Sequence, residues 1–433
     1  MTSTDGPVAD RSRARALDAA DPLAPFRRQF HIPTRAHGRE EIYFCGDSLG
    51  LQPTRTEAYV REELRTWRER GVRGHHETEW PWLPYHERIG DAMATLVGAL
   101  PSEVVVMNGL TVNLHLMMVS FFRPTRERFK ILIEDHAFPS DHYAVVSQLR
   151  LHGLDPARAL VVVSPREGEE LLRQEDLTAA IDREGDQLAL VLLPGVQYYT
   201  GQALDLRTLV EAGHRVGAVV GFDLAHAAGN LVMQLHDWGP DFACWCTYKY
   251  INSGPGAVGG CFVHARHGRA LDVPRLAGWW GHDKATRFQM GPTFDPVPGA
   301  EGWQLSNPPI LSLAAVRASL DVFAEAGGMA PLRDKSVALT GYLDGLLRER
   351  LGAQIEIVTP SEPDQRGCQL SIRVRGGRLH GTELLRRIED AGVACDFRAP
   401  NVIRVAPVPL YNTFDDVYGF VDVLARVLDA ETA

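Results

Sequence analysis

Short apolar runs alternate with amphipathic stretches through most of the 433-residue chain. The runs have the length of strands, and several consist of consecutive apolar residues rather than alternating ones. Such runs indicate strands that are buried on both faces, as in a mainly parallel sheet covered by helices. Predicted strands lie at 104–107, 130–135, 159–165, 187–196, 218–227, 241–250 and 259–264.

The stretches between these runs place apolar residues at helical spacing. The clearest, TEAYVREELRTWRER at 56–70, has one apolar side and one charged side. The first 20 residues are polar, and we expect them to be frayed. Further helices are predicted at 110–122, 141–153, 177–185 and 206–217.

The pattern changes after about residue 315. Two helical stretches are followed by short apolar segments and a helix near 383–392, which is typical of an α+β domain. The sequence therefore predicts an α/β protein with a mainly parallel central sheet, helices on both of its faces, and a smaller α+β domain. The expected domains are an N-terminal segment at 1–55 that packs partly on the small domain, a large domain at 56–315 and a small domain at 316–433.

Composition excludes several classes of protein. The net charge is −10, without the basic patch that a nucleic-acid surface needs, so no nucleic-acid partner is expected. No apolar run is long enough to cross a membrane, and the N-terminus lacks the apolar core of a signal peptide. The six scattered cysteines form neither a disulfide framework nor a metal-ligand pattern, so we expect no metal and a cytoplasmic location.

Polar residues stand at the carboxyl ends of the predicted strands, where open α/β sheets bind their ligands. Asp223 and His226 follow one apolar run, Thr111 follows another, and Asp141 follows a third. Asp223 ends a strand predicted to be buried, where an acid is costly unless it is paired. It could instead cap the segment that follows.

Lys249 lies between two tyrosines at the end of an apolar strand, just before the glycine-rich turn NSGPGAVGG. Lysine is rarely buried, so this one is either a reactive amine or a surface side chain whose stem covers the strand. The turn lacks the GxxxxGKS/T pattern and precedes a strand, which argues against a nucleotide-binding loop. The segment 108–111 opens a helix and offers an anion site, although Thr111 could simply cap that helix.

Pyridoxal 5'-phosphate (PLP) requires a lysine, a carboxylate for its ring nitrogen, an aromatic cover and donors for its phosphate. With these elements, the segment 221–260, from GFDLAH to GAVGG, resembles the cofactor segment of kynureninases, a fold-type-I family of PLP enzymes. Other matching segments occur in the same order from about residue 40 to 425. They are NGLTVNLHLMM at 108–118, AFPSDHYA at 137–144, YYTGQ at 198–202, GWWGH at 278–282, LSNPPIL at 305–311, RGCQLSI at 366–372 and NVIRVAPVPLYN at 401–412.

The resemblance implies a PLP site and assigns roles to individual residues. Lys249 would form the Schiff base with the cofactor, and Asp223 would pair with the pyridinium nitrogen. Phe138 would stack on the ring, with Asp141 and His226 hydrogen-bonded around it. The phosphate donors would be the Leu110 backbone, the Thr111 hydroxyl and Tyr248, whose phenol is also the family's suspected proton-transfer group.

The resemblance also implies a homodimer with a shared active site, because Trp279 and Asn307 would reach the cofactor from the neighbouring subunit. Arg404 would bind the substrate α-carboxylate, a task that suits its planar guanidinium. His76, Ser306 and Asn307 would lie near the aryl group of the substrate, where they could bond a ring hydroxyl. By themselves, His76 could be a loop residue and Ser306 a backbone cap before the two prolines.

The implied reaction is the hydrolysis of L-kynurenine or 3-hydroxy-L-kynurenine to an anthranilate and L-alanine, in tryptophan catabolism or NAD precursor synthesis. The polar groups near the aryl position favour the 3-hydroxy substrate. We also hypothesise that a nearby cation or phosphate lowers the pKa of Tyr248. The chain departs from the animal enzymes at Pro194, which lacks the N–H and the hydroxyl of their serine, so this contact cannot form in the same way.

Two other functions are compatible with parts of this pattern. A cysteine desulfurase or selenocysteine lyase shares the fold and the lysine placement, but it needs a mobile nucleophilic cysteine. Cys368, in RGCQLSI, is predicted at the start of a buried strand rather than in a flexible loop. A cofactor-free binding protein could have kept the fold alone, and the complete set of Lys249, Asp223, Phe138 and Arg404 argues against it.

Overall fold

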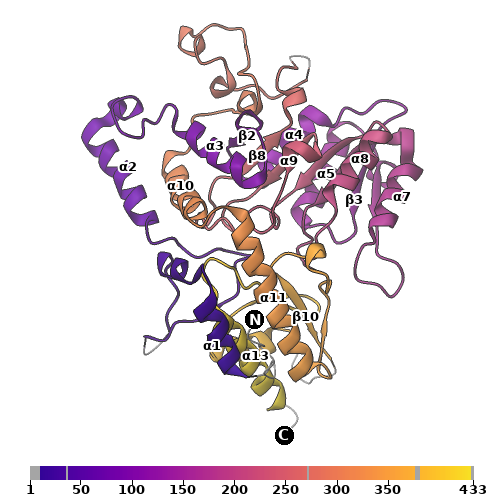
Figure 1. The fold of residues 1–433 in the computed structure, drawn as a ribbon. Coiled ribbons are helices and arrows are strands. Elements are labelled where there is room, and N and C mark those ends of the chain that lie inside the picture. Colours follow the sequence, from indigo (N-terminus) through magenta and orange to yellow (C-terminus); the bar gives the residue numbers. More distant parts are fainter. Residues whose placement is uncertain (1–9, 36–37, 271–272, 376–380, 431–433) are drawn as a thin grey trace. The chain divides into compact units, whose positions relative to one another are not determined.

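The structure, a computed structural model, describes residues 10–35, 38–270, 273–375 and 381–430. The chain divides into two compact units (Figure 1). The first unit comprises the part of the chain up to Arg55, residues 198–203 and the part from Asp321 onward, and the second comprises residues 56–197 and 204–320. Residues 198–203 and 316–320 thus fall in the other unit from the one that the sequence predicts.

The segment 198–203 belongs to the first unit because side chains of that unit hold its backbone. Thr359 donates a hydrogen bond from Oγ1 to the carbonyl of Thr200, at 2.5 Å. Ser371 does the same for the carbonyl of Tyr199, also at 2.5 Å. The other boundary, after residue 320, falls within a helix, and a periodic pattern alone does not divide a helix.

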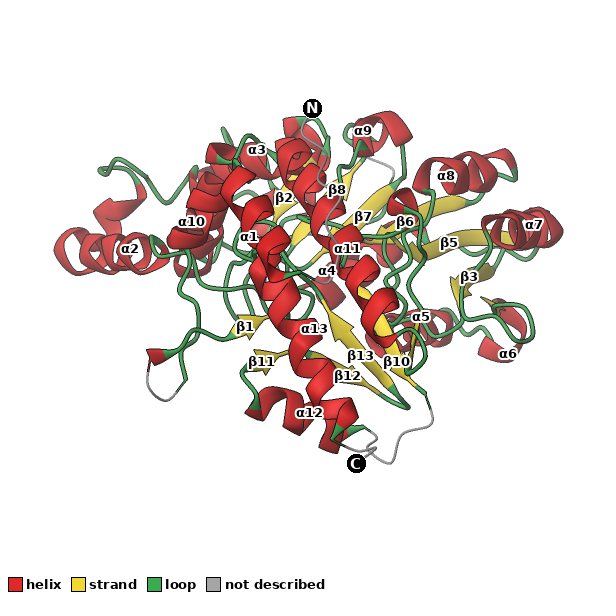
Figure 2. Ribbon diagram, turned by 60° about the horizontal axis from the view of Figure 1, so that its bottom comes forward, coloured by secondary structure: helices red, strands yellow, loops and turns green. Residues whose placement is uncertain are grey.

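The second unit is built on a seven-stranded sheet (Figure 2). Its strands are β2 (Val104–Val106), β3 (Lys130–Glu134), β4 (Leu160–Val163), β5 (Leu188–Pro194), β6 (Val219–Asp223), β7 (Phe242–Trp245) and β8 (Gly260–Val263). Their order is β2-β8-β7-β6-β5-β3-β4. The strands from β7 to β4 run parallel to one another, and β8 pairs antiparallel with both β7 and β2. The predicted mainly parallel sheet is therefore confirmed.

Helices cover both faces of this sheet. The helices that lie wholly or mostly in this unit are α2 (Thr56–Arg70), which stands apart from the sheet (Figure 2), α3 (Tyr85–Val97), α4 (Leu110–Phe121), α5 (Pro139–Leu151), α6 (Pro156–Ala159), α7 (Gln174–Glu184), α8 (Leu206–Arg215), α9 (Leu235–Trp238) and α10 (Ile310–Glu325). On β5, Leu190 and Leu192 share one apolar core cluster with side chains of α4 and α5. Val191, between them, faces Gly213 of α8, where an added Cβ would lie 2.3 Å from Val220 of β6. Successive side chains of a strand thus pack under helices on opposite faces, which explains the consecutive apolar residues.

The first unit holds a four-stranded antiparallel sheet, ordered β12-β13-β10-β9, and a separate parallel pair, β1 and β11. Its strands and helices are β1 (Ile42–Tyr43), β9 (Ile355–Ile357), β10 (Leu370–Val374), β11 (Val393–Ala394), β12 (Asp396–Arg398), β13 (Val402–Val405), α1 (Arg11–Ala20), α11 (Met329–Leu351), α12 (Thr382–Asp390) and α13 (Phe414–Asp429). One apolar cluster joins α11 and α13 to the four-stranded sheet and forms the core of this unit. Within the described parts of both units, no helix combines the length and the apolar character that a membrane crossing requires.

Residues 11–20 form α1, so the expectation that the first 20 residues are frayed is wrong for this stretch. Ala14 of α1 is fully buried in the core of the first unit. The Asp18 carboxylate accepts hydrogen bonds from the backbone N–H groups of Phe414 and Asp415, at 2.7 and 3.0 Å, and so caps α13. Arg11 adds an ion pair with Asp415. These contacts join residues that are far apart in the chain, and a local polar pattern does not reveal them.

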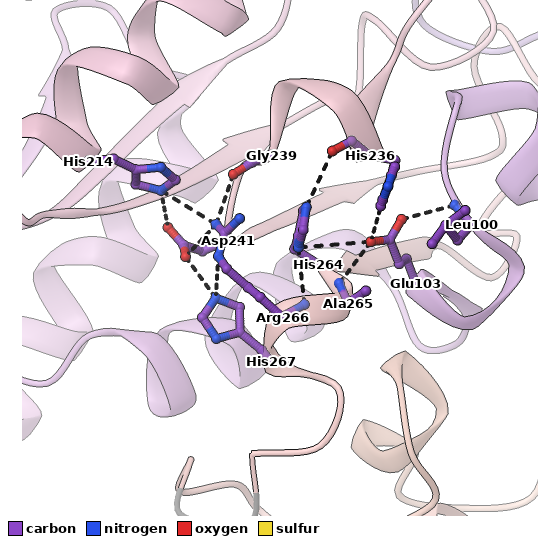
Figure 3. Close-up of polar contacts among 10 residues, drawn as sticks. All are labelled: Leu100, Glu103, His214, His236, Gly239, Asp241, His264, Ala265, Arg266 and His267. Carbon is purple, nitrogen blue, oxygen red and sulfur yellow. Dashed lines mark hydrogen bonds and ion pairs between the residues drawn. The ribbon is translucent and has the colours of Figure 1, made fainter.

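A buried acid, Asp241, joins α8, β6 and the short turn after β8 in the second unit (Figure 3). Its carboxylate bonds Nε2 of His214 at 3.0 Å, Nε2 of His267 at 2.8 Å and the guanidinium of Arg266 at 2.7 Å. It also accepts the backbone N–H of Val220 at 2.7 Å. Burial by itself raises the pKa of Asp241, but the hydrogen bonds from the two histidines and the charge of Arg266 together hold it well below its usual range.

Beside this network, Glu103 is fully buried next to two histidines (Figure 3). Its Oε1 accepts the N–H of Ala265 at 2.8 Å and bonds Nδ1 of His236 at 3.0 Å. Together with His264, these side chains have the spacing of a metal-ligand set. Nδ1 of His264 already accepts the backbone N–H of Arg266, however, at 3.1 Å. Hydrogen bonds within the protein therefore account for the arrangement.

Replacing Asp241 by Asn should lower the free energy of unfolding by about 3 kcal/mol at pH 7, because buried donors and cations lose their anion. A carboxylate with a lowered pKa stabilises the fold above its ordinary pKa and loses that effect as the pH falls toward the folded value. The difference in melting temperature between wild type and Asp241→Asn should therefore shrink between pH 7 and about pH 3. Thermal unfolding followed by circular dichroism measures it.

The control for this experiment is Asp182→Asn, because Asp182 forms an exposed ion pair with Arg215 at 2.8 Å. Its loss should change the free energy of unfolding by less than about 0.5 kcal/mol. A difference between wild type and Asp241→Asn that stays constant or widens in acid would contradict the role of the Asp241 charge.

Candidate active site

Lys249 lies in the turn after β7 and contacts side chains from two other segments. Its Nζ is 2.9 Å from Nε2 of His226, which follows β6. The same atom lies 5.9 Å from the centre of the Phe138 ring, at the start of α5. The N–H of Asn252 donates to the Lys249 carbonyl at 2.9 Å and helps to close the turn. The half-buried amine therefore faces an imidazole and an aromatic ring of its own unit.

Two carboxyls, Asp141 and Asp223, interact beside this lysine, and each residue is 7% exposed. Burial, the charge of Asp223 and a hydrogen bond with it raise the pKa of Asp141 well above its usual range, while the charge of Lys249 opposes part of this shift. This shift favours the protonated form of Asp141. Asp223 also accepts the N–H of Ala225 at 2.7 Å, so it caps the following segment as well as pairing with Asp141.

Glu134 is a third acid near this pair, and sequence reasoning missed it. It ends β3 and is 2% exposed. Burial raises the pKa of Glu134 to about 8, and the charge of Asp223 adds to the shift, against a hydrogen bond with Gln197 that lowers it. The side chain is therefore mostly protonated at neutral pH. A signal was available, because Glu134 ends an apolar run just as Asp223 does.

The N-termini of α4 and α5 meet at the same edge of the sheet. Thr111, in the first turn of α4, shares a 2.6 Å hydrogen bond with Ser140, in the first turn of α5. No side chain caps α4 at Gly109, so its first N–H groups, including that of Leu110, are left for another acceptor. In α5, Pro139 has no N–H and the N–H of Asp141 bonds the carbonyl of Phe138 at 2.9 Å, which leaves the N–H of Ser140. Two helix N-termini with two hydroxyls favour an anion such as a phosphate. Sequence reasoning missed Ser140 because its approach to Thr111 depends on how the two helices meet.

Close packing fixes the loop before α4. Asn108 has a left-handed backbone, with φ of 51°, and its side chain donates to Oδ1 of Asn113 at 3.0 Å. Asn113 in turn donates to the carbonyl of Met107 at 2.9 Å. An added Cβ on Gly259 would lie 2.7 Å from the carbonyl of Trp245, so only glycine permits this approach. The anion site is therefore held by the strands β7 and β8 rather than by a free loop.

Tyr248 is half-buried next to Lys249 in the sequence. Burial raises the pKa of its phenol above the ordinary value, and the thiol of Cys246 and the carboxylate of Asp223 raise it further. The groups of the protein that act on this phenol all raise its pKa, and the hypothesised lowering by a bound phosphate stays a prediction. At neutral pH the phenol keeps its proton and is a donor.

The residues around Lys249 fit a PLP molecule. An amine, an aromatic face, a carboxylate and a phosphate-type anion site all lie at the carboxyl edge of one sheet, which is where such sheets bind ligands. Among the described residues, Oδ1 of Asp141 and Oε2 of Glu134 are buried without a hydrogen-bond partner. Buried polar atoms normally have partners, so both are available to a bound ligand.

Pro194 ends β5 and pairs in register with Asp223 of β6. It therefore lies beside the carboxylate, where it offers neither a backbone N–H nor a hydroxyl. The next residue supplies a donor instead, because the N–H of Gly195 bonds the carbonyl of Asp223 at 2.8 Å.

Four of the predicted residues are found at the surface of the second unit. His76, Ser306 and Asn307 are exposed, and Trp279 is 40% exposed. Trp279 stacks on Trp280, with ring centres 5.8 Å apart, and lines an open hollow of about 370 Å³. Within the described residues of a single chain, the structure does not group these four with Lys249.

Arg404 lies on β13 in the first unit and is fully buried. Its guanidinium donates to Asp396 at 2.6 Å and to the carbonyl of Tyr198 at 2.7 Å, and it lies 3.1 Å from a carboxylate oxygen of Asp47. The sequence analysis predicted Arg404 as the carboxylate-binding residue, but it predicted neither Asp396 nor Asp47 as a partner. Asp47 is more than 350 positions away in the chain, so no local spacing connects the two.

Comparison with known proteins finds relatives along nearly the whole chain. A kynureninase from Myxococcus xanthus is 58% identical over 413 residues, which cover 95% of this chain and 96% of the relative. Kynureninases from Koribacter versatilis and Stenotrophomonas maltophilia are 56% and 57% identical, over 94% and 95% of this chain and 95% and 97% of their own. A family model described as the kynureninase C-terminal domain matches residues 332–424.

Solved structures with a similar fold are more distant in sequence. A cysteine desulfurase from Escherichia coli has a TM-score of 0.74 at 17% identity, over 94% of this chain and 99% of its own. A variant of C-DES with glycine covalently linked to its PLP cofactor has a TM-score of 0.74 at 18% identity, over 93% and 99%. At this identity the likeness shows the fold alone, and it confirms the predicted fold type I. The much higher identity to the bacterial relatives shows that the chain is an enzyme of the kynureninase family.

Proposed function

We propose that this chain is a PLP-dependent hydrolase that cleaves L-kynurenine and 3-hydroxy-L-kynurenine to the corresponding anthranilate and L-alanine. The observation that carries the proposal is the 2.9 Å contact of Lys249 with His226, beside the Asp141–Asp223 carboxyl pair. It occurs in a chain that is 58% identical to a protein named kynureninase.

The cofactor, when bound, supplies an electron sink for the bonds that break in the substrate. Lys249 would hold it through its amine, and the same amine, when free, would move the proton of the substrate α-carbon. Asp223 would pair with the ring nitrogen, and its hydrogen bond with Asp141 orients the Asp223 side chain. Phe138 covers the ring, and His226 orients the amine of Lys249.

The phosphate binds at the joined N-termini of α4 and α5. Thr111 and Ser140 offer hydroxyl groups there, and Leu110 offers a backbone N–H. Tyr248 contributes its protonated phenol. It exchanges protons with the substrate at the γ-carbonyl oxygen, where water adds, and at Cβ, where the Cβ–Cγ bond breaks.

Substrate recognition uses residues outside this group. Arg404 binds the α-carboxylate, for which a guanidinium fork is the best-matched group. His76, Ser306 and Asn307 contact the aryl ring and favour the 3-hydroxy substrate. Trp279 and Asn307 act in the active site of a second copy of the chain, so the working enzyme is a homodimer. The exposure of both side chains in a single chain supports this arrangement.

We further propose that the enzyme works in the cytoplasm, in tryptophan catabolism or in NAD precursor synthesis. Its six cysteines are all free thiols, as in proteins of a reducing compartment. The fold that it shares with cysteine desulfurases does not favour desulfuration. Cys368 is fully buried, and burial raises the pKa of the Cys246 thiol, whereas a nucleophilic cysteine needs access and a low pKa.

Lys249→Ala should abolish covalent attachment of PLP and the hydrolysis of kynurenine. The measurement is mass spectrometry of the holoenzyme after borohydride reduction, in which wild type carries the cofactor mass on the peptide that contains Lys249. Lys130→Ala is the control, because Lys130 pairs with Glu184 at the other end of β3. Cofactor attached to a different lysine in wild type, or hydrolysis retained by Lys249→Ala, would overturn the proposed function.

Tyr248→Phe should lower kcat by about 100-fold or more while PLP stays bound, because it removes a proton donor and leaves the ring in place. In wild type, the pH profile of kcat should show no loss from ionisation of this phenol up to about pH 10, since its raised pKa keeps it protonated there. Tyr143→Phe, at an exposed position of α5, is the control. Unchanged turnover in Tyr248→Phe removes the role.

Wild type should have a kcat/KM for 3-hydroxy-L-kynurenine that exceeds the value for L-kynurenine, by roughly tenfold if one hydrogen bond to the ring hydroxyl decides the preference. Asn307→Ala should bring the two values together, mainly by lowering the one for the hydroxylated substrate. Steady-state kinetics with both substrates measures this. An equal or higher kcat/KM with L-kynurenine would show that the polar groups do not select the hydroxyl.

A further inference from the structure

The guanidinium of Arg404 is buried with two carboxylates in the first unit. Arg404 and Asp47 are both fully buried, and their charged atoms lie 3.1 Å apart. Asp396 is closer, at 2.6 Å, and is 12% exposed. The same nitrogen, Nη2, makes both ion pairs, and it donates a hydrogen bond to Asp396. Nη1 donates to the carbonyl of Tyr198.

The two acids are held in different ways. Asp396 is directly opposite Arg404 in the antiparallel pairing of β12 and β13, where side chains share one face. It also binds the guanidinium of Arg398 at 3.0 Å. Asp396 therefore sits between two arginines and is part of the sheet. Asp47, by contrast, reaches Arg404 from the N-terminal part of the chain.

Close backbone packing brings Asp47 to the arginine. An added Cβ on Gly46 would lie 2.4 Å from Cγ2 of Val408 and 2.6 Å from the hydroxyl of Tyr411, so the chain passes here only as glycine. The preceding residues are bonded to the end of β13, because the N–H of Ala406 donates to the carbonyl of Phe44 at 2.9 Å. The position of Asp47 is thus built into the unit.

A substrate carboxylate would need the same hydrogens. Bidentate binding requires two parallel N–H groups of the guanidinium, and Nη2 already donates to Asp396 and forms an ion pair with Asp47. The side chain of Asp47 presents the same chemical group as the α-carboxylate of an amino acid. Asp396 also pairs with Arg398 and is part of the sheet. A substrate carboxylate could therefore take the place of Asp47 at Arg404 without disturbing the sheet.

We infer that Asp47 is an internal competitor for the substrate carboxylate at Arg404 and so sets the affinity of the enzyme for carboxylate-bearing ligands. The inference rests on the proposed function, in which Arg404 binds the α-carboxylate. Asp47 acts through Arg404 and does not touch the substrate. Removing its negative charge makes the site more positive, which strengthens the binding of an anion.

The test compares two amines that differ only in a carboxylate, L-alanine and ethylamine. Isothermal titration calorimetry on the holoenzyme gives the dissociation constant of each. In Asp47→Asn, L-alanine should bind about tenfold more tightly than in wild type, while ethylamine binds equally well in both. With L-kynurenine, KM should fall by a similar factor and kcat should stay unchanged. A change that is equal for both amines, or no change for L-alanine, overturns the inference.

Two further variants separate this role from a structural one. Asp21→Asn removes another buried carboxylate of the first unit, which pairs with Lys335 at 2.7 Å, and it should leave the binding of both amines as in wild type. Asp47→Ser provides a second neutral side chain in case Asp47→Asn folds poorly, and it should also bind L-alanine more tightly. Weaker L-alanine binding in both Asp47 variants would show that Asp47 only supports the arginine.

The proposed function and the role of Asp47 can fail independently of each other. If wild type binds L-alanine but does not hydrolyse L-kynurenine, the proposed function is wrong, and the comparison of Asp47→Asn with wild type still decides the inference. If wild type hydrolyses L-kynurenine and Asp47→Asn leaves both KM and the affinity for L-alanine unchanged, the proposed function stands and the inference falls.

Discussion

Burial of charge at the carboxyl edge of the parallel sheet is the constraint on which the site depends. Asp141, Asp223 and Glu134 come from different segments into a space that excludes water, and three buried carboxylates would repel one another strongly. The raised pKa values of Asp141 and Glu134 favour their protonated forms, which relieves this repulsion. The lysine amine beside them is the compensating cation. The sheet supplies the geometry, because parallel strands all end at the same edge.

Much of this site could be predicted from the sequence because its residues follow buried strands. Asp223 and Lys249 each end an apolar run, and that position alone places them at one edge of the sheet. Glu134 obeys the same rule. Ser140 does not, since its contact with Thr111 arises only where two helices meet. The pKa of Tyr248 was also out of reach, because it depends on burial and on the neighbouring Cys246 and Asp223.

The fold was predictable to the same extent and for the same reason. Where the apolar residues of a segment repeat at the spacing of a helix or strand, the structure has that element at the predicted position, as with α2 at 56–70. The helix α1 was missed because its stability comes from the far end of the chain, through Asp18 at the N-terminus of α13. Residues 198–203 were assigned to the wrong unit for a related reason, since side chains distant in sequence hold their backbone.

Gly46 shows how such long-range contacts bear on protein engineering. The glycine lies against Val408 and Tyr411, so the reach of the neighbouring Asp47 is set by backbone packing. A designer who wished to retune ligand affinity would therefore look to a short stretch near the N-terminus, where natural sequence variation could alter binding strength while every residue around Lys249 stayed the same.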